Sequence, residues 1–321
     1  MKISVVIPIY NAERHLRFSL GSVLWQTHSD WECICVDDGS TDGSGALLDE
    51  YAAKDERIRV MHQANAGEGA ARNAGMDVAT GELVAFLDAD DAWHPDALKL
   101  IAEAREKTGA DVIRYGWRHL ESHVGAFGPL PQGEVRIEPV DFALRRESTI
   151  RFCTLGAATV VARAACGDIR FCGLTQGADL VYVMDCLIRS PRAAFIDAPL
   201  LHYLTHPGQI SRRISKGLVL GTCGYVPEVV ARCAKLGESH EAWADTRRYV
   251  CKLVFCRLLG SWRLFDNKSD REEVRQAFWI MLGRLVAQPG FFPTWRHGIM
   301  ELAHRRKSGI LLYIVKLATR R

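Results

Sequence analysis

The chain has 321 residues, 48% of them hydrophobic and 25% charged, which are ordinary values for a globular protein. This length suits one domain with an appendage, and the lack of repeats or low-complexity tracts excludes fibrous and repetitive classes. The net charge is +3, yet residues 292–321 hold seven Lys and Arg against the single Glu301. Such a basic end favours an anionic partner, phospholipid or nucleic acid, with a solvated helix end as the alternative.

The ten cysteines include no C-x-x-C pair, which disfavours a zinc site or a thioredoxin-like redox motif. Unpaired thiols favour a reducing compartment. The N-terminus shows no signal-peptide pattern, and no apolar run reaches the ~18 residues that span a bilayer. We therefore expect a cytoplasmic protein, with peripheral contact at the inner face of the membrane as the hypothesis for its basic tail.

Strand and helix signals alternate over the first 120 residues, which is typical of a mostly parallel sheet flanked by helices. Apolar runs predict strands at residues 3–9, 32–36, 58–61, 83–87 and 111–115. Helical patterns fall between them, one ending at residue 24 and others at residues 45–53, 68–78 and 97–107. Ligands of such sheets bind beyond the carboxyl ends of the strands.

The remainder of the chain is less regular. A Gly- and Pro-rich stretch at residues 125–133 predicts a loop, and strands at 159–161 and 193–196 flank a helix at 178–188. From about residue 211 the apolar spacing is helical, and its aromatic and aliphatic stripes are interpreted as packing. We expect a catalytic α/β domain over residues 1–210 and an α-helical region over residues 211–321.

Two carboxylates, Asp88 and Asp90, follow the fourth predicted strand in a D-x-D pattern. Residues i and i+2 at a strand end project to the same side, so both side chains can approach one ion. Oxygen ligands favour Mg²⁺ or Mn²⁺ over zinc, and such an ion stabilises a departing diphosphate. A solvated acidic turn is the alternative, because isolated D-x-D strings are common.

The second strand ends at Asp37 and Asp38, and a Gly-Ser-Thr-Asp turn follows it. Asp38 can accept the imide N–H of uracil, thymine or guanine, whereas Asp37 is expected to cap the turn. Tyr10, at the end of the first strand, can stack on a base, and a buried core tyrosine is the alternative.

Small residues and one arginine follow the third strand, in Asn65-Ala66-Gly67 and in the run from Gly69 to Gly75. The small residues allow close packing of a helix on the sheet, and Arg72 offers a fork of donors to phosphate or ribose oxygens. The alternative is a buried arginine paired with Asp88 or Asp38. The G-x-G-x-x-G pattern of dehydrogenases does not follow the first strand.

Together these motifs resemble the family-two glycosyltransferases of the GT-A fold, of the type that builds bacterial polysaccharides and glycolipids. The matching stretches are Val5-Val6-Ile7-Pro8-Ile9-Tyr10-Asn11, Val36-Asp37-Asp38-Gly39-Ser40-Thr41-Asp42, Ala71-Arg72-Asn73-Ala74-Gly75 and Phe86-Leu87-Asp88-Ala89-Asp90-Asp91. The resemblance implies a Rossmann-like GT-A nucleotide-sugar domain, and it does not extend beyond about residue 210.

The resemblance also implies roles for individual residues. Asp90 would bind the Mn²⁺ or Mg²⁺ that bridges the diphosphate, with Asp88 as a second ligand. His206 would touch the metal or a phosphate, and a surface histidine is the alternative. The implied donor-binding residues are Pro8 and Tyr10 at the base, Asp38 at its imide, Asn65 and Arg72 on the nucleotide, and Asp88 and Ala89 near the ribose.

The family's catalytic base is usually the aspartate of a Glu-Asp pair at the start of a helix. Gln176-Gly177-Ala178-Asp179 is similar to that segment, which makes Asp179 the implied base, although Ala178 replaces the glutamate. An ordinary helix cap is the alternative for Asp179.

The implied activity is inverting transfer of a sugar from a nucleotide diphosphate, with UDP favoured, to a hydroxyl acceptor such as a saccharide or lipid-linked saccharide. One alternative is a sugar-nucleotide nucleotidyltransferase. That class needs a Gly-rich basic loop after the first strand, and the segment there contains neither Gly nor Lys. Another is a nucleotide-sugar-binding or scaffold protein whose activity has lapsed, with Ala178 as the hint. Nucleic-acid binding is disfavoured because the tail lacks an interleaved aromatic motif. A homodimer through the helical region stays open.

Deleting residues 292–321 is expected to abolish binding of the purified protein to anionic liposomes, since these residues supply the basic and apolar side chains. Co-sedimentation measures the effect, and vesicles of neutral lipid serve as the control. Unimpaired binding of the shortened protein would rule out this membrane role.

Overall fold

The computed structural model describes residues 1–120, 130, 135–141, 158–174, 177–206, 216–235 and 268–286. The chain divides into two compact units, Met1–Leu144 with Phe152–Gln209 and Arg145–Arg151 with Ile210–Arg321. The expected functional division at residue 210 stays a prediction. The basic tail, Gln176 and most of the loop predicted at 125–133 lie outside the described residues.

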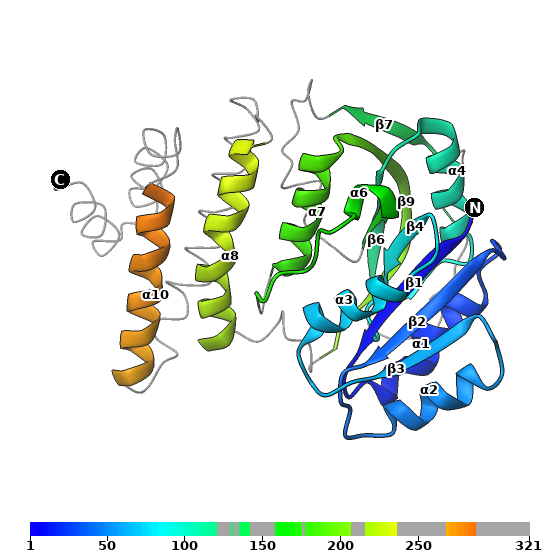
Figure 1. The fold of residues 1–321 in the computed structure, drawn as a ribbon, viewed down its shortest axis with the longest axis horizontal. Coiled ribbons are helices and arrows are strands. Elements are labelled where there is room, and N and C mark those ends of the chain that lie inside the picture. Colours follow the sequence, from blue (N-terminus) through cyan, green and yellow to red (C-terminus); the bar gives the residue numbers. More distant parts are fainter. Residues whose placement is uncertain are drawn as a thin grey trace. The chain divides into compact units, whose positions relative to one another are not determined.

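The first unit is built on four parallel strands in the order β3-β2-β1-β4 (Figure 1). The strands are β1 (Ile3–Ile9), β2 (Trp31–Asp37), β3 (Ile58–His62) and β4 (Leu83–Phe86). Every residue of β1, β2 and β4 is buried, which explains why they are continuous apolar runs without alternation. The connecting helices are α1 (Glu13–Leu24), α2 (Ser44–Ala52) and α3 (Glu68–Val78).

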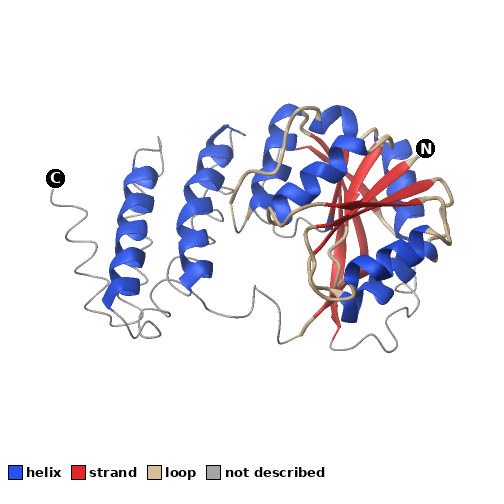
Figure 2. Ribbon diagram, turned by 60° about the horizontal axis from the view of Figure 1, so that its bottom comes forward, coloured by secondary structure: helices blue, strands red, loops and turns tan. Residues whose placement is uncertain are grey.

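The sheet continues from β4 through strands of both directions, and Figure 2 shows its strands lying between helices. β8 (Thr159–Ala162) pairs antiparallel with β4 and with β6 (Val112–Leu120), and β6 pairs parallel with β9 (Arg192–Leu204). β5 (Ala92–Trp93) and β7 (Ile137–Asp141) pair antiparallel with β9. Six strands of this nine-stranded sheet therefore share one direction, which confirms the mostly parallel α/β prediction.

Several elements differ from the sequence-based expectation. β5, β7 and the short helix α6 (Arg163–Cys166) were not predicted, and β9 is far longer than the four residues expected. Pro199 lies within this strand opposite Gly116 at a register shift, where proline is tolerated. The helices α4 (Ala97–Thr108) and α7 (Ala178–Arg189) match the prediction closely.

Helix α3 lies unusually close to the sheet. A Cβ added to Gly75 would stand 2.4 Å from Val6 Cγ1, so only glycine permits this approach. The contact fixes α3 over β1 and places Arg72 near the carboxyl end of β4.

Buried carboxylates fasten the amino ends of the strands. Glu32 at the start of β2 accepts hydrogen bonds from Ser4 Oγ (2.6 Å), Thr80 N (2.7 Å) and Lys2 Nζ (3.1 Å). Burial alone would raise the pKa of Glu32, but these hydrogen bonds outweigh it and lower the pKa to about 2. The charged form of Glu32 is therefore strongly favoured in the folded protein.

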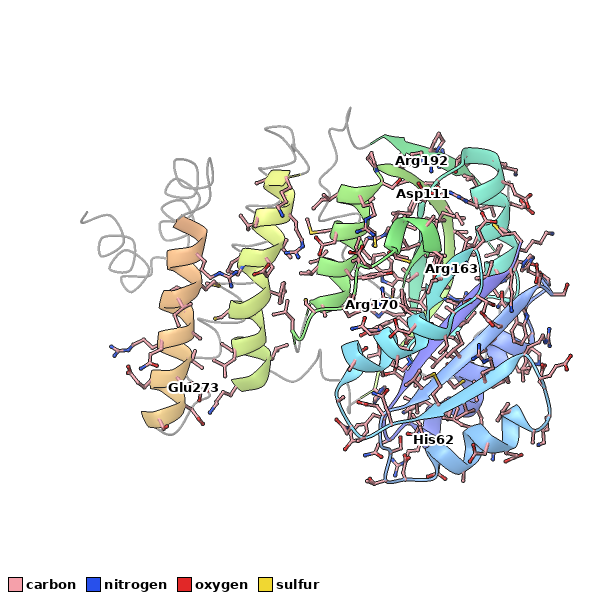
Figure 3. The ribbon with its side chains drawn as sticks, in the orientation of Figure 1. His62, Asp111, Arg163, Arg170, Arg192 and Glu273 are labelled. Carbon is pink, nitrogen blue, oxygen red and sulfur yellow. The ribbon has the colours of Figure 1, made fainter. Side chains whose placement is uncertain are left out.

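A second buried carboxylate lies at the amino ends of β6 and β9. Asp111 accepts hydrogen bonds from Arg105, Ser190 and Arg192, and Figure 3 labels Asp111 and Arg192. Burial tends to raise the pKa of Asp111, and the donated hydrogen bonds together with the guanidinium charge of Arg192 lower it. Both carboxylates lie far along the strands from the acidic motifs at the carboxyl ends.

The second unit contains α8 (Lys216–Lys235) and α10 (Lys268–Val286), which pack on each other. Lys216 pairs with Asp270 at 2.6 Å, and Arg284 pairs with Glu228. Met281, one of the apolar residues expected to pack, is fully buried. Among the described helices, none is long and apolar enough to cross a bilayer.

Replacing Glu32 by Gln is expected to lower the free energy of unfolding at pH 7 by about 3 kcal/mol, from the depressed pKa of the carboxylate. Because the folded-state pKa lies below the ordinary value, this stabilisation is present above about pH 4.5 and is lost as the pH falls toward 2. Urea denaturation of Glu32→Gln and wild type at pH 7 and pH 3 measures it. Equal differences at both pH values would contradict the assignment.

Candidate functional site

The loops that follow β1 and β2 are locked to each other. Asn11 Oδ1 accepts the Thr41 N–H at 2.8 Å, and the Asn11 N–H donates to Ser40 Oγ at 3.0 Å. Asn11 has a left-handed φ of 52°, a conformation that asparagine tolerates better than most residues. Tyr10 beside it is 53% exposed, so the core-tyrosine alternative is wrong, and Pro8 is buried within β1. Their contact with a base stays a prediction.

Asp38 organises the loop that leads into α3. Its Oδ1 accepts hydrogen bonds from Gln63 Nε2 (2.7 Å) and the Ala66 N–H (2.9 Å), and its Oδ2 accepts the Gly67 N–H (2.8 Å). Asp38 is only 2% exposed, while Asn65 in the same loop is exposed. A carboxylate can accept about four hydrogen bonds, so Asp38 can still accept the imide N–H of a base in addition to these three. The sequence did not indicate this loop-holding role.

Asp37 accepts the Ser40 N–H at 3.0 Å, which is the turn-capping contact expected from the sequence. Its other oxygen lies 2.9 Å from Nδ1 of His62, labelled in Figure 3. Burial acts to raise the pKa of Asp37, but hydrogen bonds from Ser40 and His62 lower it overall. The same contact, together with Asp49, raises the pKa of His62. This pair supports the β2–α2 turn and was not foreseen.

Arg72 is a buried cation between carboxylates. One of its terminal nitrogens lies 2.6 Å from Asp88 and 2.5 Å from Glu68, and its guanidinium stands over the Phe171 ring at 5.3 Å. Burial would lower the pKa of Arg72, but the charges of Glu68, Asp88 and Asp179 raise it overall. The buried-arginine alternative is therefore confirmed, with Asp88 as a partner. Direct contact with the nucleotide stays a prediction.

Asp88 is held by Arg72 at one of its oxygens. Burial raises the pKa of Asp88 to about 7, opposed by Arg72 and reinforced by repulsion from Glu68 and Asp90. Such a raised pKa is typical of carboxylates gathered at functional sites. Ala89, the next residue, is 9% exposed, so its side chain offers little contact area.

The D-x-D segment is joined directly to the end of β9. Buried Asp91 accepts the Leu204 N–H at 3.0 Å, and β5 pairs Ala92 with His202. These contacts bring His206 Nε2 within 2.9 Å of Asp90 Oδ2. The surface-histidine alternative is wrong, because His206 is 24% exposed and contacts Asp90.

The donor set at this point suits a hard divalent cation. The Asp90 side chain is 30% exposed, so an ion can reach it. Within the described residues, no group of three or more His, Cys, Asp or Glu side chains forms a metal cage. Mg²⁺ and similar ions are often held by one or two carboxylates, with water and substrate phosphates completing the shell. The carboxylates of Asp90 and Asp88 fit that arrangement, and His206 Nε2 lies beside Asp90 as a nitrogen donor.

Asp179 lies in the first turn of α7, where Gly177 occupies the N-cap position. The cap alternative for Asp179 is therefore wrong. Asp179, Arg72 and Tyr182 line one hollow, and the charge of Asp179 contributes to the raised pKa of Arg72. The structure thus brings the implied base and the D-x-D carboxylate Asp88 to the same guanidinium.

Some of the residues that lie at this site were not predicted from the sequence. Glu68 pairs with Arg72 at the i,i+4 spacing of helical ion pairs, a signal that was available. His15 of α1 stacks on His206 with ring centroids 4.6 Å apart, and Phe171 lies beneath Arg72. These two join the site through long-range contacts, for which the sequence holds no local signal.

An open, mostly parallel sheet with carboxylates beyond β2 and β4 is typical of α/β proteins that bind ligands at the carboxyl ends of their strands. Residues 4–160 match the model of glycosyl transferase family 2. Residues 4–160 of the chain are therefore identified as a domain of this family.

The relatives and solved structures agree with this family. YibD, an uncharacterized glycosyltransferase of Escherichia coli K12, is 30% identical over 227 residues, covering 67% of this chain and 65% of YibD. The first curated relatives, YibD among them, are matched over less than two thirds of their own length.

Two solved structures show the same fold. S. aureus TarS 1-349 in complex with UDP-GlcNAc has a TM-score of 0.66 at 22% identity, over 88% of this chain and 81% of that one. Mannosyltransferase PcManGT from Pyrobaculum calidifontis, in complex with GDP-Man and Mn²⁺, has a TM-score of 0.56 at 15% identity, over 98% and 83%. The predicted GT-A fold is thereby confirmed.

Replacing Asp38 by Asn is expected to lower the free energy of unfolding by about 1–3 kcal/mol, because the amide NH₂ faces N–H donors that then lack an acceptor. Urea denaturation measures this loss. The control is Asp49→Asn, which removes the same charge from a side chain that is 66% exposed and should change stability by less than about 0.5 kcal/mol. Equal losses in the two variants would contradict the loop-holding role.

Proposed function

We propose that this protein is an inverting, metal-dependent glycosyltransferase that moves a sugar from a nucleotide-diphosphate donor to a hydroxyl acceptor. One observation carries the proposal: Arg72 is buried against Asp88 and within the field of Asp179. The donor-side and acceptor-side carboxylates are therefore held around one cation. An inverting displacement needs donor and acceptor groups in a fixed relation, because nucleophile, anomeric carbon and leaving group must lie in line.

A UDP-sugar is the proposed donor. Exposed Tyr10 offers a ring for stacking on the base, and Asp38 holds the neighbouring loop with acceptor capacity to spare. The TarS structure in complex with UDP-GlcNAc supports this choice, whereas the PcManGT structure contains GDP-Man. Asn65 is exposed in the same loop and is proposed to contact the nucleotide.

A divalent cation is the proposed cofactor, held by Asp90 and His206 with Asp88 nearby. Mn²⁺ in the PcManGT complex supports a divalent ion in this fold, and Mg²⁺ would suit the carboxylate donors of the same site. When bound, the ion would neutralise charge that develops on the departing diphosphate. On the protein side, Arg72 offsets the charge of Asp88, which keeps the acidic motif from repelling the donor.

Asp179 is the proposed base. It would remove the proton of the acceptor hydroxyl as that oxygen bonds to the anomeric carbon and the bond from this carbon to the phosphate oxygen breaks. The configuration at the anomeric carbon is thereby inverted. The acceptor is proposed to be a saccharide or lipid-linked saccharide of the cell surface. Peripheral contact at the inner leaflet and a homodimer remain proposals for the region beyond residue 210.

A thermal-shift screen identifies the donor, since a ligand that binds only the folded protein raises its apparent stability. We expect UDP-sugars to raise the melting temperature more than GDP- or dTDP-sugars, and Mn²⁺ to increase the shift. A larger shift with a GDP-sugar would overturn the UDP assignment. Binding without any turnover across an acceptor panel would instead favour a lapsed transferase.

Replacing Asp179 by Asn, or Asp90 by Ala, is expected to lower kcat of sugar transfer by about 10²–10⁴-fold, the usual contribution of a positioned acid–base group or ion. Asp179→Asn should keep donor affinity within about threefold of wild type, because only the acceptor proton loses its partner. Glu103→Gln on α4 removes an equal charge elsewhere and is the control. Turnover within tenfold of wild type in either variant would overturn that role.

A further inference from the structure

A short segment, residues 169–174, is bound to helix α3 through the side chain of Asn73. Asn73 Nδ2 donates to the Phe171 carbonyl at 3.0 Å, and Asn73 Oδ1 accepts the Phe171 N–H at 2.8 Å. The amide therefore satisfies both backbone groups of a residue 98 positions away. Backbone groups away from regular structure need such partners, so this pair fixes where Phe171 lies.

The Phe171 ring lies at the junction of the candidate site. It stacks on Tyr182 with centroids 4.3 Å apart and planes at 11°, and it meets the edge of Phe86 at 5.1 Å. The Arg72 guanidinium stands 5.3 Å above it. Phe171 is 6% exposed, so the ring is part of the packing that supports the site.

Tyr182 carries this contact to the proposed base. It follows Asp179 by three residues in α7, and residues at that spacing share one face of a helix. Tyr182 and Asp179 line the same hollow as Arg72 and Phe171. The Phe171 ring is therefore packed against the residue that lies one turn after the proposed base.

Neighbouring residues of α3 thus support the two sides of the site. Arg72 reaches Asp88 on the donor side, while Asn73 reaches Phe171 on the acceptor side. Consecutive residues of a helix point about 100° apart, so Arg72 and Asn73 of one rigid turn can contact the donor side and the acceptor side of the site. A fixed relation between donor and acceptor groups is what an in-line displacement requires.

We propose that Asn73 is a positioning residue, which holds Asp179 at its working distance from the donor through Phe171 and Tyr182. The proposal rests on the function proposed above for Asp179. It concerns geometry alone, because Asn73 touches none of the groups assigned to the donor or to proton transfer.

A second contact between the same two segments supplies a matched control. Arg170, labelled in Figure 3, pairs with Asp77 of α3 at 2.7 Å. The side chains of Arg170 and Asp77 are 38% and 59% exposed, and such surface pairs contribute little to stability. Asp77→Asn therefore removes one link between the segments without touching the Asn73–Phe171 pair.

The first measurement is hydrogen exchange of the full-length protein without ligands. In Asn73→Ala we expect faster exchange in peptides covering residues 177–186, with β1 and β2 unchanged. Asn73→Asp keeps the acceptor for the Phe171 N–H and should show a smaller effect, which also guards against a poorly folded alanine variant. Asp77→Asn should match wild type. Unchanged exchange at residues 177–186 in both Asn73 variants would overturn the coupling.

The second measurement is a double-mutant cycle on sugar transfer. Asn73→Ala alone is expected to lower kcat at least tenfold with donor affinity within about threefold, since small displacements of a reacting group cost that much. Added to Asp179→Asn, it should lower kcat by less than about twofold, because the group it positions is already lost. Fully additive losses would overturn the proposal. If Asp179→Asn transfers sugar like wild type, the base assignment fails, and the exchange data still decide the coupling.

Discussion

The candidate site depends on one buried cation. Arg72 is 6% exposed, and a guanidinium removed from water to this degree is tolerated only when carboxylates offset the loss of hydration. Glu68, Asp88 and Asp179, which come from three separate segments of the chain, supply these charges. Because each of these carboxylates would repel the others, the arginine is also what allows acidic groups to gather. The acidic motif and its cation are thus a single electrostatic unit.

Close packing of α3 on the sheet makes this unit possible. Gly75 lets the helix approach Val6, and Asp38 fixes the loop that enters the helix at Gly67. With both ends of α3 anchored, Arg72 has little freedom to move away from Asp88. Asp91 performs a similar task for the other side of the site, since its bond to Leu204 joins the D-x-D segment to β9. Rigid elements thereby hold the side chains that the chemistry needs.

Much of the fold could be predicted from sequence because its strands are buried on both faces. Such strands appear as unbroken apolar runs, and the helix at Glu68–Val78 was bounded correctly by its alanine-rich pattern. The short strand Ala92–Trp93 gave no such signal, because its two residues are strand only through pairing with β9. The long β9 was predicted only over residues 193–196, and its register with β6 shows that the strand continues to Leu204.

Residues of the candidate site could be predicted where they belong to a local sequence motif. They could not be predicted where contacts between distant segments bring them to the site. Asp88, Asp90 and Asp179 stand at strand or helix ends that the pattern located. The ring of Phe171 and the stacking of His15 on His206 come from segments far apart in the chain, so no spacing rule points to them. The prediction for Asp38 was also incomplete, because the three groups that donate hydrogen bonds to it come from the loop after β3.

Glu32 and Asp111 lie at the opposite ends of the strands from the acidic motif, and each is enclosed by its own set of donors. Two buried anchors of the sheet therefore lie at the pole opposite the proposed catalytic pole. A lineage could exchange loops at the catalytic pole, and with them the sugar or acceptor that is handled, while the other pole keeps the scaffold folded. Laboratory evolution of specificity has the same freedom, provided that changes stay at the catalytic pole.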